Sequence, residues 1–153
     1  WYYEQIDLGY NYRMSDIQAS LGISQMKRLN HFISKRHKIA SRYEKLLNQE
    51  WIQLPWQHPE SYSAFHLFII RIRKNKKLIT HKKVFEILRK SNINVNLHYI
   101  PIYNHPFYEK IGYNKSEFPQ ANLYYSEAIS LPIYPGLKKS EQEYIVDILS
   151  NIK

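Results

Sequence analysis

Asn11 and Arg13 are the residues of this chain whose types and spacing most directly suggest chemistry. They stand two positions apart, just before residues 15–18, SDIQ, which have the pattern of a capping box that starts a helix. On extended backbone the two side chains would point the same way, beside the free amide groups and positive dipole of a helix N-terminus. An amide donor and a planar guanidinium suit the oxygen atoms of a phosphate. The pattern predicts an anion-binding corner, although these residues are also typical of a hydrogen-bonded turn before a helix.

The sequence lacks the other common catalytic and ligand-binding motifs. None of its seven His stands at a metal-ligand spacing, and the absence of Cys excludes a thiolate zinc site, a disulfide and a cysteine nucleophile. Its four Gly form neither a GxGxxG pattern nor a phosphate loop, and no GxSxG motif is present. We therefore expect no metal site and no nucleotide held by glycines.

Composition places the chain among soluble single-domain proteins. Its 153 residues are 44% apolar and 23% charged, which is enough for one core. Twenty-two Lys and Arg against thirteen Asp and Glu give a net charge of +9, which favours anionic partners such as nucleic acid, an anionic membrane or a phosphorylated small molecule. The basic residues are spread along the chain, as those of solvated helix faces also are. With no signal peptide, no run of ~20 apolar residues and no Cys, we expect a cytosolic protein.

A long helix is predicted over residues 15–48, after an extended arm at residues 1–14. Apolar residues keep a helical spacing through this range, and no proline interrupts them. The range contains either one helix or two nearly collinear ones, with Gly22 and the pair Asn30-His31 as the places where it could bend. A rod of ~50 Å would exceed the ~40 Å diameter of a compact domain of this size. Unless it kinks back, we expect a missing domain or a second subunit to cover part of its apolar stripe.

The remaining pattern alternates strands and helices, so we predict one α+β domain over residues 1–153, with the sheet and its helices in residues 64–153. Strands are expected at 64–73, 93–99 and 131–133, and a basic turn at 74–77. Helices are expected at 80–90, capped by Thr80, and at 119–129, and a second capping box at 140–143 should open a terminal helix. In the strand 93–99, alternation puts Val95, Leu97 and Tyr99 on the core side and His98 on the polar side.

Several ordered segments resemble the C-terminal small domain of the DegT/DnrJ/EryC1/StrS sugar aminotransferases, which are fold-type-I pyridoxal 5'-phosphate enzymes. The resemblance begins at WYYEQ (1–5) and GYNYRMSDIQASLG (9–22) and covers essentially all 153 residues. It continues through SQMKRL (24–29), AFHLF (64–68), VNLHYIPIY (95–103) and SLPIYP (130–135). It implies a long N-terminal helix and a small, mainly antiparallel sheet flanked by helices.

The resemblance also implies roles for individual residues. Asn11 and Arg13 match the motif that reaches the cofactor phosphate of the neighbouring subunit in a homodimer. His98, Tyr99 and Tyr103 match the segment that lines the sugar-nucleotide cleft, although a polar strand face explains His98 equally well. The family's cofactor-bonding lysine and the cofactor's other main contacts lie in a large N-terminal domain. We therefore expect this chain to be a C-terminal fragment that contains no catalytic residue and is inactive alone.

Within the family, WYYEQ and NLHYIPIY are most similar to the members of pseudaminic acid biosynthesis. Those enzymes aminate C4 of a UDP-4-keto-6-deoxy-N-acetylhexosamine with glutamate as donor, so a UDP-sugar and glutamate are the expected substrates, with neither nucleic acid nor a membrane as partner. Two alternatives remain open, a basic nucleic-acid-binding module and a non-catalytic interaction domain. Aromatic residues on a sheet face and a continuous basic groove would favour nucleic acid.

Overall fold

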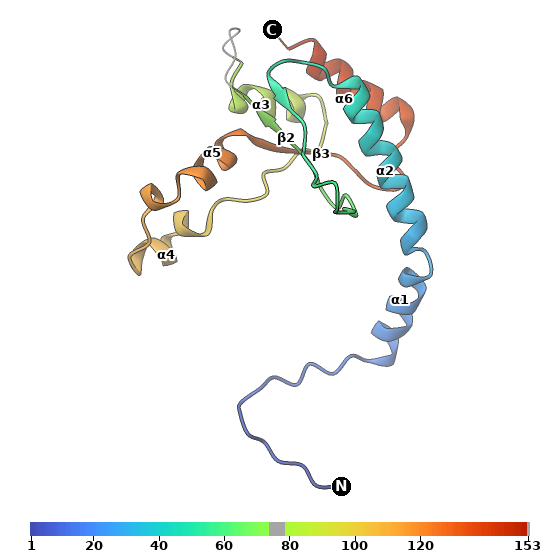
Figure 1. Ribbon diagram of the computed structural model, residues 1–153, viewed down its shortest axis with the longest axis vertical. Helices are drawn as coiled ribbons and strands as arrows, with labels where there is room; N and C mark the ends of the chain where they lie inside the picture. Colours follow the sequence, from blue (N-terminus) through green and yellow to red (C-terminus); the bar gives the residue numbers. More distant parts are fainter. Residues whose placement is uncertain (74–78, 153) are drawn as a thin grey trace. The chain divides into compact units, whose positions relative to one another are not determined.

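The computed structural model describes residues 1–73 and 79–152 and divides the chain into two units, residues 1–31 and 32–153 (Figure 1). Each unit is described by itself below. The basic turn expected at 74–77 lies outside the described residues.

The first unit contains an N-terminal segment without regular structure and the helix α1 (Asp16–Met26). The predicted capping box starts this helix: the Ser15 amide donates to Gln18 Oε1 at 2.9 Å, and the Gln18 amide donates to Ser15 Oγ at 3.4 Å. These bonds satisfy amides that the first helical turn leaves without partners. None of the residues in α1 is buried.

The range 15–48 contains two helices, so the two-helix alternative describes the chain and a single rod does not. After α1, α2 runs over Leu29–Leu46. The interruption is at Lys27 and Arg28, not at Gly22 or at Asn30-His31. The Arg28 amide donates to the Gln25 carbonyl at 3.0 Å, a tighter i to i+3 bond of the kind that ends many helices. Apolar periodicity continues across such a break, which is why the spacing alone does not reveal it.

The second unit is built on a three-stranded antiparallel sheet in the order β1-β2-β3. The strands are β1 (Ile52–Gln53), β2 (Phe68–Ile72) and β3 (Ala128–Leu131), so the third strand begins three residues before the expected 131–133. Opposite residues share a face, and Ile70 pairs with Ile129 on the face that points into the core. Alternate residues of β2 are therefore buried, as the run FIIRI indicates.

Helices α2, α3 (His81–Lys90) and α6 (Lys139–Ser150) cover this core face (Figure 1). The Tyr43 ring of α2 lies 5.0 Å from that of Phe68, and its hydroxyl donates to the Pro132 carbonyl at 3.0 Å. Gln142 of α6 is buried and donates to the Ile39 carbonyl at 2.7 Å, which joins α6 to α2. No helix among the described residues is both long and apolar enough to cross a membrane.

The strand expected at 93–99 is reduced to one bridge, in which the Ser130 amide donates to the Asn96 carbonyl at 2.9 Å. Local bonds take the other donors: the Val95 amide bonds the Ile93 carbonyl at 2.9 Å, and the Leu97 amide bonds Asn96 Oδ1 at 2.8 Å. Such local bonds compete with a ladder. The alternation holds for Val95, which is buried, but the expectation that Tyr99 faces the core is wrong, because its side chain is 74% exposed.

The remaining helices differ from the prediction only in detail. Thr80 caps α3 as expected, with Lys83 donating its amide to Thr80 Oγ1 at 3.2 Å. The capping box expected at 140–143 is wrong by two residues, because α6 begins at Lys139 and Glu141 accepts from the Lys138 amide at 2.7 Å. The helix expected at 119–129 is α5 (Pro119–Glu127). The aromatic loop before it contains η1 (Ile102–Asn104), α4 (Pro106–Lys110) and η2 (Lys115–Glu117).

Candidate functional site

Asn11 and Arg13 lie in the first unit, exposed and just ahead of α1. The Tyr12 amide donates to the Tyr10 carbonyl at 3.1 Å, so the backbone makes a three-residue turn at Asn11 and is not extended there as expected. The rings of Tyr10 and Tyr12 stack with their centroids 5.3 Å apart. Within residues 1–73 and 79–152, neither the Asn11 nor the Arg13 side chain has a hydrogen-bond or ion-pair partner. Both keep all their donors for a ligand, and their chemistry fits a phosphate.

The second unit has a sheet face that the core helices do not cover. Gln53 lies opposite Arg71, and Ile69 lies opposite Ser130, so these four side chains share what we call the pocket face. A cavity of about 450 Å³ opens on this side, within the size range of small-molecule sites. It is lined by part of the pocket face, the loop 54–67 and α5: Gln53, Leu54, Pro55, Trp56, Gln57, His58, Ser61, Ser63, Phe65, Leu67, Ile69, Arg71 and Tyr124.

Two neighbouring residues of α2 hold the loop that forms the cavity wall. Arg36 Nη1 donates to the carbonyls of Phe65 and Ile133, both at 2.9 Å. His37 Nε2 lies 2.8 Å from the Ser63 carbonyl, and its ring stacks on Tyr62 with centroids 4.3 Å apart. The loop is therefore fixed at its second half, while Trp56 in its first half is 76% exposed.

A buried carboxylate pairs with the arginine of the pocket face. Glu127, which is only 8% exposed, accepts from Arg71 Nη2 at 2.7 Å and from Arg73 Nη1 at 3.2 Å. The Arg71 guanidinium also lies 5.5 Å from the centre of the Tyr124 ring. Burial raises the pKa of the Tyr124 phenol, and the Arg71 charge opposes that rise in part. Tyr124 therefore presents a neutral hydroxyl at the cavity wall at neutral pH.

The structure separates the three residues predicted to line a sugar-nucleotide cleft. His98 projects onto the pocket face, where its Nδ1 lies 2.7 Å from Ser130 Oγ. Exposed Tyr99 stands edge-on to the His98 ring at 4.6 Å. Tyr103 is buried instead, stacked on Phe118 at 4.6 Å with its hydroxyl donating to Asn122 Oδ1 at 3.0 Å. Its hydroxyl is thus engaged within the domain, and the cleft role of all three residues stays a prediction.

Ser130, Arg71 and Tyr124 are site residues that the sequence reasoning missed. Arg71 and Ser130 each stand as the lone polar residue among the apolar residues of a short strand, FIIRI and AISL. A polar residue at one alternate position of such a strand indicates that one sheet face is not core. That signal was available for Arg71, whereas Ser130 lies just before the strand expected at 131–133. Nothing in the local pattern distinguishes Tyr124 from a core tyrosine.

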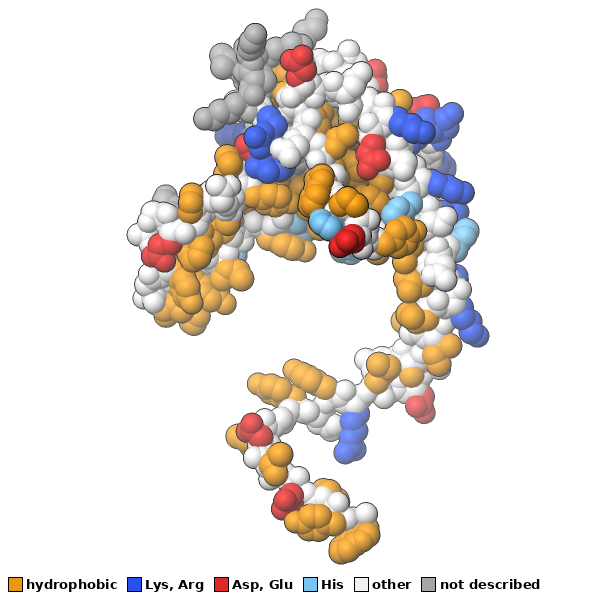
Figure 2. All heavy atoms as spheres, viewed as in Figure 1, with side chains coloured by type: hydrophobic (Ala, Val, Ile, Leu, Met, Phe, Trp, Pro, Cys, Tyr) orange, Lys and Arg blue, Asp and Glu red, His pale blue; other side chains and the backbone are white. Residues whose placement is uncertain are grey.

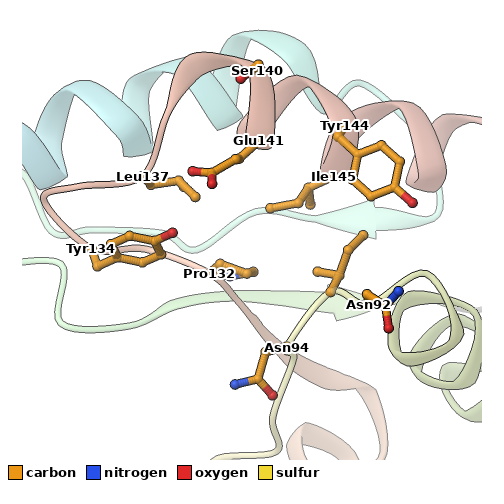
Figure 3. Close-up of a pocket in the computed structure, with 10 residues that line it drawn as sticks. Asn92, Asn94, Pro132, Tyr134, Leu137, Ser140, Glu141, Tyr144 and Ile145 are labelled. Carbon is orange, nitrogen blue, oxygen red and sulfur yellow. The ribbon is translucent and has the colours of Figure 1, made fainter.

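A second cavity, of about 550 Å³, lies between the start of α6 and residues 92–94 and 132–137 (Figure 3). The Tyr134 hydroxyl and the Glu141 carboxylate point into it from opposite sides in Figure 3. Much of its polar lining already serves the fold: Glu141 caps α6, and the Tyr144 hydroxyl donates to the Ser91 carbonyl at 3.3 Å. Within the described part of the chain, no group of three or more His, Asp or Glu is placed to hold a metal ion.

A model of the DegT/DnrJ/EryC1/StrS aminotransferase family matches residues 1–150. The chain belongs to this family. The α+β fold matches the C-terminal part of solved sugar aminotransferases, which agrees with the resemblance noted in the sequence. The family match includes Asn11 and Arg13, the residues of the pocket face, and His98.

Three relatives within the DegT/DnrJ/EryC1/StrS family illustrate the similarity. The spore coat polysaccharide biosynthesis protein SpsC of Bacillus subtilis is 34% identical over 99% of this chain and 40% of its own length. The PLP-form structure of the putative sugar aminotransferase Spr1654 of Streptococcus pneumoniae superposes with a TM-score of 0.83 at 28% identity, over 96% of this chain and 38% of that one. PseC of Helicobacter pylori, an aminotransferase of pseudoaminic acid biosynthesis, gives 0.79 at 30% identity, over 96% and 40%. The chain thus spans about 40% of the length of such relatives.

Proposed function

We propose that this chain supplies the C-terminal portion of a pyridoxal phosphate-dependent sugar aminotransferase. The observation that carries the proposal is the Asn11 and Arg13 pair, which lies within the family match and keeps its donors free beside the start of α1. Relatives of the same family bind the cofactor, as the PLP-form of Spr1654 illustrates. A phosphate group is the ligand that these two donors fit best.

In this proposal the cofactor, when bound, supplies the electron sink that lets an amino group move between substrates. Asn11 and Arg13 bind its phosphate, with the cofactor belonging to the neighbouring subunit of a homodimer. His98 and Tyr99 bind the sugar nucleotide on the side of the pocket face. Tyr103 lines the same cleft, and the bond from its hydroxyl to Asn122 Oδ1 fixes the segment that follows His98 and Tyr99.

An uncovered apolar surface supports the proposal that this chain packs against another domain or subunit. Side chains between residues 99 and 124 remain exposed, among them Ile102 and Phe107, and Figure 2 shows apolar side chains gathered over α4 and α5. Contiguous apolar surface of this kind is typical of an interface. We infer that another domain or subunit covers it.

For the substrate, we propose a UDP-4-keto-6-deoxy-N-acetylhexosamine aminated at C4 with glutamate as donor, in the synthesis of a surface sugar of the pseudaminic acid type. The similarity to PseC supports this choice, and the similarity to SpsC supports surface polysaccharide more broadly. The test is to supply the full-length enzyme with cofactor, glutamate and the 4-keto UDP-sugar and to detect the amino sugar by mass spectrometry. The expected result is an amino product that needs glutamate. If the enzyme aminates only other keto sugars, the proposed substrate is wrong. If it transfers an amino group to no keto sugar, the proposed aminotransferase function is wrong.

The nucleic-acid alternative receives less support. The strands of the pocket face carry Gln53, Ile69, Arg71 and Ser130 and, in the described part of the sheet, no aromatic residue that could stack on a base. Lys and Arg do gather along α2 in Figure 2, as expected for a solvated helix face. The cytosolic location expected from the sequence stays a prediction.

A further inference from the structure

We propose that Ser130 is a positioning residue that fixes the tautomer of His98, so that His98 Nε2 carries the proton and donates it to an oxygen atom of the ligand. The inference rests on the proposed function in one respect, namely that His98 contacts the sugar nucleotide. The tautomer itself follows from the geometry of the described residues alone.

Ser130 is held firmly between β2, where it pairs with Ile69, and the bridge to Asn96. Its side chain is only 6% exposed, and its neighbours in β3, Ile129 and Leu131, are core residues. Its backbone forms both bonds of the bridge to Asn96, with N–O distances of 2.9 and 3.4 Å. The bridge sets the position of the segment that carries His98 two residues later. Because alternate residues share a face, His98 returns to the pocket face directly over Ser130.

The proton positions follow from hydrogen-bond accounting. The Ser130 hydroxyl is buried, and within the described chain its hydrogen-bond partner is His98 Nδ1 at 2.7 Å. If Nδ1 carried a proton, it would donate to Oγ, and the buried hydroxyl hydrogen would have no acceptor, which is unfavourable. The hydroxyl therefore donates and Nδ1 accepts. A neutral imidazole has one N–H, so the proton lies on Nε2.

The consequence is a directed donor on the pocket face, beside Ser130. His98 Nε2 has no partner within the described residues, and the side chain is half-buried, so the N–H is free for a ligand. A fixed donor binds hydroxyl, carbonyl or phosphate oxygens and rejects ammonium and amide N–H groups at the same place. Ser130 thus determines which chemical class His98 accepts without touching the ligand.

The first experiment reads the tautomer directly. The full-length enzyme is labelled with ¹⁵N-histidine, and long-range ¹H–¹⁵N NMR gives the resonances of the ring nitrogens at a pH at which the histidines are neutral. The His98 signals are assigned as those that are absent from the His98→Asn variant. We expect Nδ1 to resonate as an unprotonated nitrogen and Nε2 as a protonated one. In Ser130→Ala both resonances should move toward values averaged over the two tautomers. A protonated Nδ1 in the wild type, or unchanged resonances in Ser130→Ala, would overturn the inference.

The second experiment measures the dissociation constant of UDP-N-acetylglucosamine, a stable sugar nucleotide, by calorimetry. We expect Ser130→Ala to weaken binding roughly three- to ten-fold, the range for one neutral hydrogen bond. Ser130→Thr, which keeps the hydroxyl, should retain the wild-type resonances and affinity. If the threonine variant does not fold, Ser130→Cys serves as the control in its place. Unchanged affinity in Ser130→Ala despite a changed tautomer would overturn the positioning role. Unchanged affinity in His98→Asn would instead count against the proposed substrate contact, while the NMR result would stand.

Discussion

Asn11 and Arg13 have no competing contacts within the described chain, so their substitution should act on ligand binding and not on folding. Each removes hydrogen bonds to a charged phosphate worth about 1.5–3 kcal/mol. We therefore predict that Asn11→Ala and Arg13→Ala each weaken cofactor binding on the order of 10- to 100-fold in the full-length enzyme. Arg13→Lys should recover only part of the loss, because lysine lacks the planar fork of donors. Cofactor titration followed by absorbance measures each dissociation constant.

The matched control for that titration is Lys27→Ala, which removes an equal charge from the same unit at the end of α1. Its cofactor affinity should stay close to that of the wild type, because the effect depends on position and not on net charge. Wild-type affinity in both alanine variants would assign Asn11 and Arg13 to the turn and the helix cap only.

Tyr43 gives the core a measurable dependence on pH. Burial, and to a lesser extent the nearby Tyr134, raises the pKa of the Tyr43 phenol well above its ordinary value of 10.0. The folded state thus keeps a proton that the unfolded state loses, so this stabilisation is complete below pH 10 and falls as the pH rises further. In Tyr43→Phe that contribution disappears, and the unpaired Pro132 carbonyl should cost about 1–2 kcal/mol at neutral pH. Urea unfolding of both proteins from pH 7 upward checks this; a constant difference above pH 10 would contradict it.

At the scale of elements, Glu127 joins the end of α5 to Arg71 of β2 and to Arg73, which follows that strand. Replacing this largely buried carboxylate by an amide removes the negative charge that the guanidinium groups of Arg71 and Arg73 contact. We predict that Glu127→Gln lowers the free energy of unfolding by about 1.5–3 kcal/mol, the range for hydrogen bonds to charged groups. The control is Glu143→Gln, because Glu143 pairs with Arg42 at 2.5 Å but its side chain is 53% exposed. That exposed pair should contribute less than ~1 kcal/mol, and equal losses in the two variants would refute the distinction.

Elements that depend on local signals were predicted well. The caps at Ser15 and Thr80, the strand β2 and the helices α3 and α5 follow from cap residues and apolar spacing within a few positions. The break at Lys27 and the bridge at Asn96 could not be predicted, since each depends on which of several possible partners a backbone amide selects. The start of α6 was misplaced because Glu141 reaches the Lys138 amide, and a sequence pattern does not say which amide a carboxylate caps.

In the candidate site, too, some features could be predicted from the sequence and others could not. Strand alternation put His98 on the polar side, where the structure has it bonded to Ser130, but the bridge that brings the two residues together is not a sequence pattern. The burial of Tyr103 was beyond reach, because it depends on Phe118 and Asn122, which are distant in the sequence. Asn11 and Arg13 were selected by type and spacing, but the turn at Asn11 arises from a backbone bond that the sequence pattern does not specify.

At the scale of the whole molecule, the proposal that Arg13 reaches the cofactor of the neighbouring subunit predicts complementation between two variants that are each inactive at a limiting cofactor concentration. One variant is Arg13→Ala, and the other lacks the lysine that bonds the cofactor. In a mixed dimer, one site combines the intact lysine of the first subunit with the intact Arg13 of the second. Random pairing should restore about a quarter of wild-type activity, because half of the dimers are mixed and each has one complete site. Aminotransferase assays after joint refolding measure it, and mixing without subunit exchange is the control. No recovery from verified mixed dimers would place Arg13 at the cofactor of its own subunit.

The alternation of the sheet also bears on how such a protein can diverge. Along β1 and β2, residues that fill the core and residues that border the cavity occupy successive positions, so one strand carries two independent sets of constraints. Mutations at Gln53 and Ile69 change the cavity wall, whereas Ile52 and Ile70 beside them remain bound to the core. Ligand preference can therefore change through single substitutions at Gln53 or Ile69, while Ile52 and Ile70 stay the same and preserve the core.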